Sequence, residues 1–255
     1  MKWPIQTKRG KHIYIIKIMQ YASFNYVHLI YLVICLLLGV AVYILLRNKE
    51  NYMQNRIMLL LILTCAVIKI YNMFEYVQYG WYTIFWNLPL YICSLNVFIL
   101  PWLIISKKSH PIMAHYLSFI AIPGAIFSMI FPGISENVYS IFSPVLLEAF
   151  YTHTIYITIG LLYIKFNKYT ISKKYILNVA LVITIMSIGG HIVNEILVYT
   201  KIDIGANYMF TEYGLAGTPL VWLYNLIPIK LLYLLLGYYL MLFLRFCFYI
   251  IKEKF

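Results

Sequence analysis

The sequence predicts an all-α, polytopic membrane bundle with about seven transmembrane helices, because apolar stretches long enough to cross a bilayer recur along the chain. Of its 255 residues, 63% are hydrophobic and 11% are charged, and the mean hydropathy is +0.82. A soluble domain usually has about a quarter of its residues charged. These observations together assign the protein to the membrane class.

Each expected span contains roughly 20 apolar residues, the length that crosses the hydrocarbon core as a helix. Helix-breaking residues support the boundaries, since Pro132 and Gly133 follow the fourth span and residues 214–219 precede the seventh. We expect a basic tail at residues 1–22 and a single integral membrane bundle at 23–255. The expected spans are residues 26–46, 57–75, 82–105, 112–131, 142–164, 176–199 and 220–250.

Basic residues gather in alternate loops, and this pattern predicts the orientation of the bundle. Lys and Arg total 20 against 8 Asp and Glu, and most lie after the first, third and fifth spans and at the C-terminal end. The positive-inside rule therefore puts the C-terminus in the cytoplasm and the N-terminus outside. Five basic residues among the first 22 disagree, so either His12–Tyr21 lies on the membrane surface or the span count differs by one.

The charge pattern and composition also bear on partners and location. The basic residues are spread between apolar segments instead of along one face, so nucleic-acid binding is not expected and membrane lipids are the expected partners. Abundant Ile, Lys, Tyr and Phe suggest an AT-rich genome, which favours a bacterial protein that crosses the cell membrane several times.

The third span contains a candidate nucleophile. Cys93 follows Pro89, which is expected to kink the helix and open space beside it, and Asn96 shares a helical face with Cys93. A thiol becomes a nucleophile when a neighbouring base takes its proton. The alternative is that Cys93 packs between helices as a small apolar residue. None of the four cysteines forms a CxxC pair, so neither a disulfide framework nor a zinc site is indicated.

The fifth and sixth spans contain the other polar candidates. His153 could act as a general base, or could instead hydrogen-bond across a helix pair, and Glu148 is a candidate substrate-binding residue of the same span. In the sixth span His191, Asn194 and Glu195 lie at i, i+3 and i+4 and form one stripe. They are candidate substrate-binding residues or a polar patch near the membrane exit. Metal binding by His191, Glu195 and His153 is weakly indicated, and no metal or other cofactor is expected.

Two lysines and one loop complete the candidates. Lys69 lies near the middle of the second span and needs a carboxylate partner, for which Glu148 and Glu195 are available, whereas Lys230 could extend to the interface. The segment between the sixth and seventh spans combines turn formers with aromatic residues. It is either an ordinary loop or a lid over a cavity, and in the second case Asn207 and Tyr208 would contact substrate.

Three short motifs resemble those of the YwaF-type integral membrane proteins, the bacterial branch related to transmembrane protein 164. The resemblance covers nearly the whole chain after residue 22, and His28 also fits it. The motifs are Leu88-Pro89-Leu90-Tyr91-Ile92-Cys93, Phe150-Tyr151-Thr152-His153 and Gly205-Ala206-Asn207-Tyr208-Met209.

This resemblance implies a bundle of six or seven spans and a cysteine-dependent lipid acyltransferase, which moves an acyl chain from a phospholipid to a lysophospholipid. By analogy Cys93 is the nucleophile and His153 transfers the proton. The sequence departs from the eukaryotic Pro-Cys-His motif, because Leu90 and Tyr91 follow Pro89, and Cys93 is a substitute one turn further on. The alternatives are a transporter or ligand-binding protein with a polar cavity, and a structural subunit without chemistry.

Overall fold

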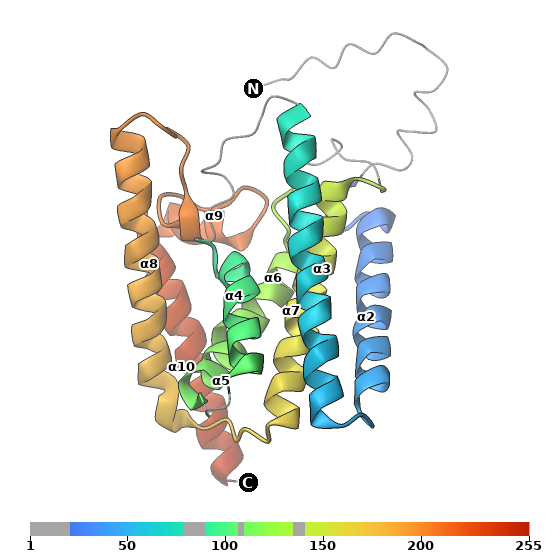
Figure 1. The fold of residues 1–255 in the computed structure, drawn as a ribbon. Helices are drawn as coiled ribbons and strands as arrows, with labels where there is room; N and C mark the ends of the chain where they lie inside the picture. Colours follow the sequence, from blue (N-terminus) through green and yellow to red (C-terminus); the bar gives the residue numbers. More distant parts are fainter. Residues whose placement is uncertain (1–20, 79–89, 107–109, 135–140, 255) are drawn as a thin grey trace.

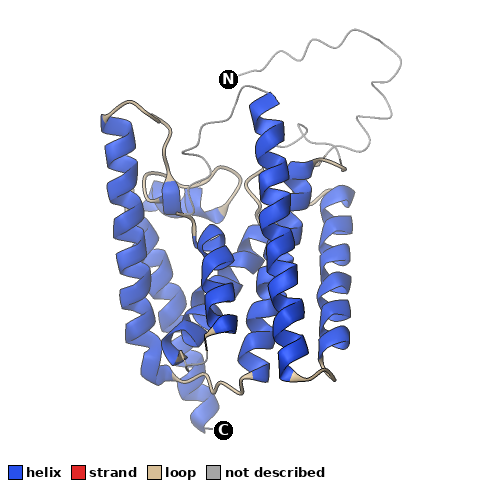
Figure 2. Ribbon diagram, in the orientation of Figure 1, coloured by secondary structure: helices blue, strands red, loops and turns tan. Residues whose placement is uncertain are grey.

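The computed structural model describes residues 21–78, 90–106, 110–134 and 141–254, and all regular elements in these ranges are helical (Figure 2). Five helical segments are long and apolar enough to cross a membrane, and two shorter apolar helices, Ile92–Ile105 and Leu232–Cys247, accompany them. The predicted fold class, a polytopic α-helical membrane bundle, is confirmed. Residues 1–20 of the predicted basic tail lie outside the described ranges.

Successive long helices run in alternate directions across the bundle (Figure 1). A π-helical turn, Leu117–Ala121, connects α5 to α6, so that these two act as one pass. Short 3₁₀ turns occur at Lys173–Tyr175 and Tyr208–Phe210. The helices are α2 (Tyr26–Leu46), α3 (Asn51–Gln78), α4 (Ile92–Ile105), α5 (Pro111–Tyr116), α6 (Ile122–Ile130), α7 (Pro144–Phe166), α8 (Ile176–Tyr199), α9 (Pro219–Leu226) and α10 (Leu232–Lys254).

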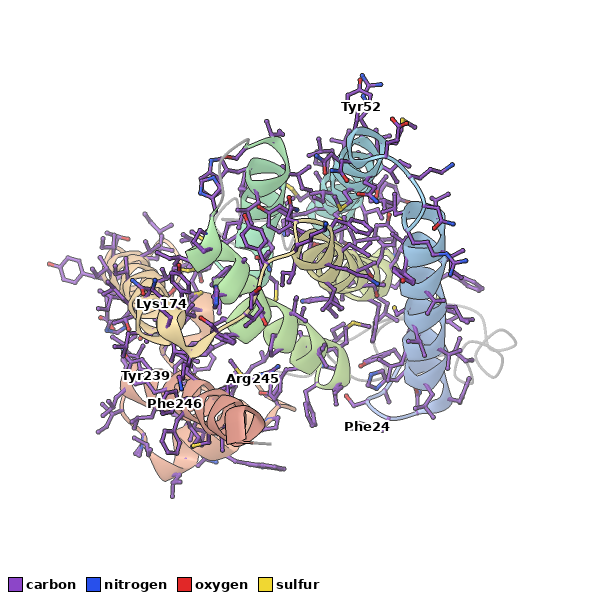
Figure 3. All side chains as sticks on the ribbon, turned by 90° about the horizontal axis from the view of Figure 1, so that it is seen from below. Phe24, Tyr52, Lys174, Tyr239, Arg245 and Phe246 are labelled. Atoms are coloured by element: carbon purple, nitrogen blue, oxygen red, sulfur yellow. The ribbon has the colours of Figure 1, made fainter. Side chains whose placement is uncertain are left out.

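Burial distinguishes the central helices from those at the periphery. In the apolar stretch of each span, the buried share of residues is 56% in Pro111–Ile130 and 50% in α7, but 17% in α2. Viewed along the bundle, α2 and α8 lie on opposite sides, with α4 to α7 between them (Figure 3). Leucines such as Leu36 and Leu177 remain exposed on the outer helices, as expected of side chains that contact lipid. The central helices therefore form the walls within which a site can be enclosed.

The prediction of one continuous helix for the seventh span, residues 220–250, is wrong. The structure has two helices there, α9 and α10, separated by Ile227–Leu231. Pro228 has no N–H group and disfavours a helical conformation of the residue before it, and Leu231 has a left-handed φ of 58°. The sequence signal, Pro228, was present and should have ended the helix.

The third predicted span also needs correction, because α4 begins only at Ile92. Tyr91 is its N-cap and has an extended backbone, so Leu90 precedes the helix and Cys93 lies in its first turn. Leu90 and Cys93 are therefore not successive turns of one helix. The predicted kink at Pro89, like residues 82–89 as a whole, lies outside the described residues.

His28, which fits the family resemblance, links two helices. Its Nδ1 accepts a hydrogen bond from the Phe24 amide at 2.9 Å, and its Nε2 donates to the Met129 carbonyl oxygen at 2.9 Å. The ring is fully buried. Since both ring nitrogens are used, His28 joins the start of α2 to the end of α6 and has no free nitrogen for chemistry.

The basic loops after α2 and α7 lie at the same end of the bundle as the C-terminus, and the loop after α8 lies at the other end (Figure 1). We expect a membrane-impermeant maleimide to label Ile204→Cys in intact cells and Lys168→Cys only after permeabilisation, because the basic end should face the cytoplasm. The unsubstituted chain is the control for its four free cysteines. The opposite labelling pattern would reverse the orientation.

Candidate functional site

Two adjoining cavities lie inside the bundle at the level where α4 begins. The smaller has a volume of about 90 Å³ and is lined by Cys93 from α4 and His153 from α7. The larger, of about 450 Å³, lies under the loop that follows α8 and is lined by Asn207 and Tyr208 among others. Lys69, Ser94 and Glu148 line both. The shared residues make the two cavities neighbouring compartments of one site.

Cys93 and His153, from separate helices, are brought together in the smaller cavity. Both side chains line this cavity, so the thiol and the imidazole share one compartment. Nδ1 of His153 lies 2.5 Å from the carbonyl oxygen of Ala149, one turn earlier in α7. A carbonyl oxygen only accepts, so Nδ1 carries the proton and Nε2 of the neutral ring is free to accept one.

The position of Cys93 within α4 is also relevant to its chemistry. It is the second residue of this 14-residue helix, and the N-cap Tyr91 supplies no side-chain hydrogen bond to the first turn. The first backbone N–H groups of a helix and its dipole favour negative charge nearby. Sequence reasoning could not anticipate this placement, because it assumed a continuous helix through Pro89.

Lys69 pairs with Glu148, one of the two partners expected for it. The Lys69 Nζ lies 3.4 Å from Glu148 Oε1, and the amide of the buried Asn72 donates a hydrogen bond to Oε2. Both charged side chains are partly exposed, at 32% and 22%, because they face the cavities. The pair thus joins α3 to α7 and at the same time provides the charged part of the cavity wall.

The loop over the larger cavity is held firmly on α8 by Asn194. The Asn194 side chain accepts from the Tyr208 amide at 2.8 Å and donates to the Tyr208 carbonyl oxygen at 3.0 Å and to the Thr211 hydroxyl at 2.9 Å. Met209 has a φ of 57° and packs on Gly190, where a Cβ atom would lie 2.9 Å from Met209 Cγ. The absence of a side chain at Gly190 lets the loop approach the helix.

A second set of polar contacts fixes the end of this loop. Glu212 accepts hydrogen bonds from His191 Nδ1 at 2.7 Å and from Lys230 Nζ at 2.8 Å, and Lys230 also reaches Glu195 at 2.6 Å. Burial acts to raise the pKa of Glu212, but hydrogen bonds from Lys230, His191 and Thr211 outweigh it and lower the pKa below its ordinary value. Lys230 therefore pairs with two carboxylates instead of extending alone to the interface.

His191, Glu195 and Glu212 also have ligand atoms that lie within 4.8 Å of one another, a spacing at which a metal ion could be held. The Lys230 ammonium, however, already bridges the two carboxylates. A cation at this position would have to displace Lys230, so the arrangement fits an ion-pair network better than a metal centre.

The predicted substrate-binding residues divide into two groups. Glu148, Asn207 and Tyr208 line the larger cavity. The four others line neither of the two cavities described, and a role for them in substrate binding stays a prediction; they are Asn96, His191, Asn194 and Glu195.

The contacts and burial of the second group explain why these residues do not line the cavities. Asn194 is buried and uses its amide to hold the loop, while His191 and Glu195 belong to the ion-pair network. Asn96 is also buried, at 1% exposure. The densest polar cluster of the sequence is therefore an anchor for the loop.

Sequence reasoning missed several residues of the larger cavity, including Tyr91, Asp203 and Tyr213. The Tyr91 ring lies 5.3 Å from the rings of both Tyr208 and Phe210, so the start of α4 packs directly against the loop. The available signal was position in the sequence, because Tyr91 lies within the first quoted motif and Asp203 and Tyr213 lie close to the third.

Comparison with known proteins identifies a family. The model of the TMEM164 family matches residues 21–250, which is most of the chain. No curated protein and no solved structure matches it.

The contacts of Asn194 lead to a stability prediction. Asn194→Ala should lower the free energy of unfolding by about 3 kcal/mol, because the Tyr208 amide would stay buried without its partner and the Tyr208 carbonyl oxygen and the Thr211 hydroxyl would each lose a hydrogen bond. Chemical unfolding in detergent micelles measures the change. Asn167→Ala, which removes a single hydrogen bond to Tyr163 at a helix end, is the control and should cost less than about 1 kcal/mol. Equal losses would mean that Asn194 does not hold the loop.

The lowered pKa of Glu212 predicts acid sensitivity. Its ionised form stabilises the folded state at pH values above the unfolded pKa of 4.5, and this contribution is lost as the pH falls through the lower folded value. Glu212→Gln should therefore be less stable than the parent at neutral pH and show a flatter decline on acidification, measured as the thermal midpoint. The control Glu50→Gln removes an exposed carboxyl. A parental acid profile for Glu212→Gln would contradict the assignment.

Proposed function

We propose that this chain, which belongs to the TMEM164 family, is a membrane-embedded acyltransferase acting on phospholipid acyl esters through Cys93 and His153. The observation that carries the proposal is the shared cavity: a thiol and an imidazole from separate helices line the same cavity of an apolar bundle. Such a pair is the usual arrangement for nucleophilic catalysis at an ester. The membrane concerned is, in this proposal, the cell membrane, where both lipid substrates are found.

In the first half of the reaction, Nε2 of His153 takes the proton of the Cys93 thiol. The thiolate attacks the carbonyl carbon of an acyl ester, and a C–S bond forms. The C–O bond to glycerol breaks, and the leaving oxygen takes the proton back from the imidazolium. The products are a lysophospholipid and an acyl thioester on Cys93.

In the second half, the hydroxyl of an acceptor lysophospholipid gives its proton to His153 and attacks the thioester. The new C–O bond forms, the C–S bond breaks, and the sulfur leaves as a thiolate that recovers its proton from the imidazolium. The chain's own thiol and imidazole supply each step of this exchange, so it requires neither a metal nor an organic cofactor. Water would hydrolyse the thioester, so the proposed reaction requires that water be kept from Cys93.

The dimensions of the site suit a lipid substrate. A cavity of about 450 Å³ is within the usual range of ligand sites and adjoins the compartment of Cys93. Its polar wall, with Lys69 and Asp203, can receive the glycerol and head-group portion, while the acyl chains remain among the apolar helices. The same polar cavity favours a second candidate, a ligand-binding protein or transporter without catalysis.

Acyl exchange between a labelled phospholipid and a lysophospholipid in proteoliposomes tests the proposal. Cys93→Ala should abolish exchange, and His153→Ala should slow it by about 10²- to 10⁴-fold, because proton transfer is lost. The parent should accumulate a thioester on Cys93 that hydroxylamine cleaves. Cys247→Ala, which changes a cysteine outside both cavities, is the matched control.

The two candidates give different results in this assay. Full exchange by Cys93→Ala would remove the proposed nucleophile. Lipid binding by the parent without exchange or thioester would support the ligand-binding candidate instead.

A further inference from the structure

The ion pair between Lys69 and Glu148 lies where the two cavities meet. Glu148 gives the smaller cavity a carboxylate and Lys69 gives it an ammonium group, and both residues also line the larger cavity. A group that enters the larger cavity can therefore reach Lys69 without entering the compartment of Cys93. This location distinguishes the pair from an ion pair that only ties two helices together.

The two partners are held unequally. Glu148 has its second oxygen fixed by the amide of Asn72, which is buried at 1% exposure. Lys69 contacts Glu148 at 3.4 Å, a long separation for a charge-assisted hydrogen bond, and an ammonium group has three donors. Lys69 is thus the partner that can turn to an incoming anion, while Asn72 keeps the Glu148 carboxylate in place.

Glu148 also lies beside the proposed base. It lines the smaller cavity together with His153, and it directly precedes Ala149, whose carbonyl oxygen accepts a hydrogen bond from Nδ1 of His153. A carboxylate near an imidazole stabilises the protonated ring, and this effect is strong where water is scarce. While Lys69 neutralises Glu148, the effect is reduced.

We propose that the Lys69–Glu148 pair makes activation of the nucleophile depend on substrate binding. A phosphate group that enters the larger cavity pairs with Lys69, and Glu148, still held by Asn72, then stabilises the imidazolium that forms when His153 takes the proton of Cys93. The inference rests on the proposed function for its biological meaning. Lys69 is the residue that senses the substrate, and the phosphate group is the feature that it senses.

The rate of Cys93 alkylation by iodoacetamide, quantified by peptide mass spectrometry in maltoside micelles, tests the inference without requiring turnover. Glu148→Gln should slow alkylation about tenfold, because the charge that favours the imidazolium is lost while the side-chain shape is kept. Lys69→Met should accelerate it by a similar factor, because Glu148 is no longer neutralised. Opposite signs are the key result, since loss of a merely structural ion pair would change the rate in one direction for both variants.

Added ligands test the phosphate step in the same assay. Hexadecylphosphocholine, which has a phosphate group but no acyl ester, should accelerate alkylation in the parent and have no effect in Lys69→Met. Inorganic phosphate added alone separates a lipid head group from a free anion: acceleration by the lipid alone assigns the site to head groups, and acceleration by both assigns it to phosphate generally. No acceleration by either ligand would overturn the inference.

Lys165→Met is the matched charge-loss control, because Lys165 contacts Tyr43 at the exposed end of α7, and it should leave the rate unchanged. Changes of the same sign in Glu148→Gln and Lys69→Met would overturn the inference. The proposed function fails separately, by exchange activity that survives in Cys93→Ala. Changes of opposite sign in the alkylation rates of the two variants, in a protein without exchange activity, would support the charge coupling but not its role in catalysis.

Discussion

Lipid tails supply no hydrogen-bond partners, so each polar side chain inside this bundle has to find its partner within the protein. This constraint is met at two places that shape the candidate site. One is the wall between the two cavities, where Glu148 is satisfied by Lys69 and Asn72. The other is the contact between α8 and the loop that follows it, where Asn194 and Glu212 are satisfied. The remaining contacts of the bundle are largely apolar packing.

The second polar region holds in place the loop that lines the larger cavity. The loop forms part of the wall of the larger cavity, and it keeps its unusual backbone, with left-handed Met209 and Phe210, because α8 and α10 hold it at several points. Residues in this conformation persist only where their surroundings fix them. The anchoring network is thus a condition for the shape of the site, although none of its ion-pair residues His191, Glu195 and Glu212 lines the cavities.

Hydropathy predicted the membrane class, the first span and the sixth span, because length and apolar character determine which segments cross a bilayer. It missed the break at Pro228, since the apolar residues on both sides continued the pattern. Patterning within one helix identified His191, Asn194 and Glu195 as a stripe but could not say what the stripe faces. Its partner, Glu212, lies in a loop 21 residues from His191, and only the tertiary structure brings them together. Cys93 and His153 were selected as a thiol and an imidazole within apolar spans, and only the tertiary structure places them in one cavity.

The short α4 has a consequence for the surrounding bilayer. A helix of 14 residues rises about 21 Å, less than the roughly 30 Å of a typical hydrocarbon core. Lipids beside such an element accommodate the mismatch by local thinning, which lowers their glycerol backbones toward the midplane. Cys93 is in the first turn of this helix, so the depression would bring the ester linkages of neighbouring lipids closer to the depth of its sulfur.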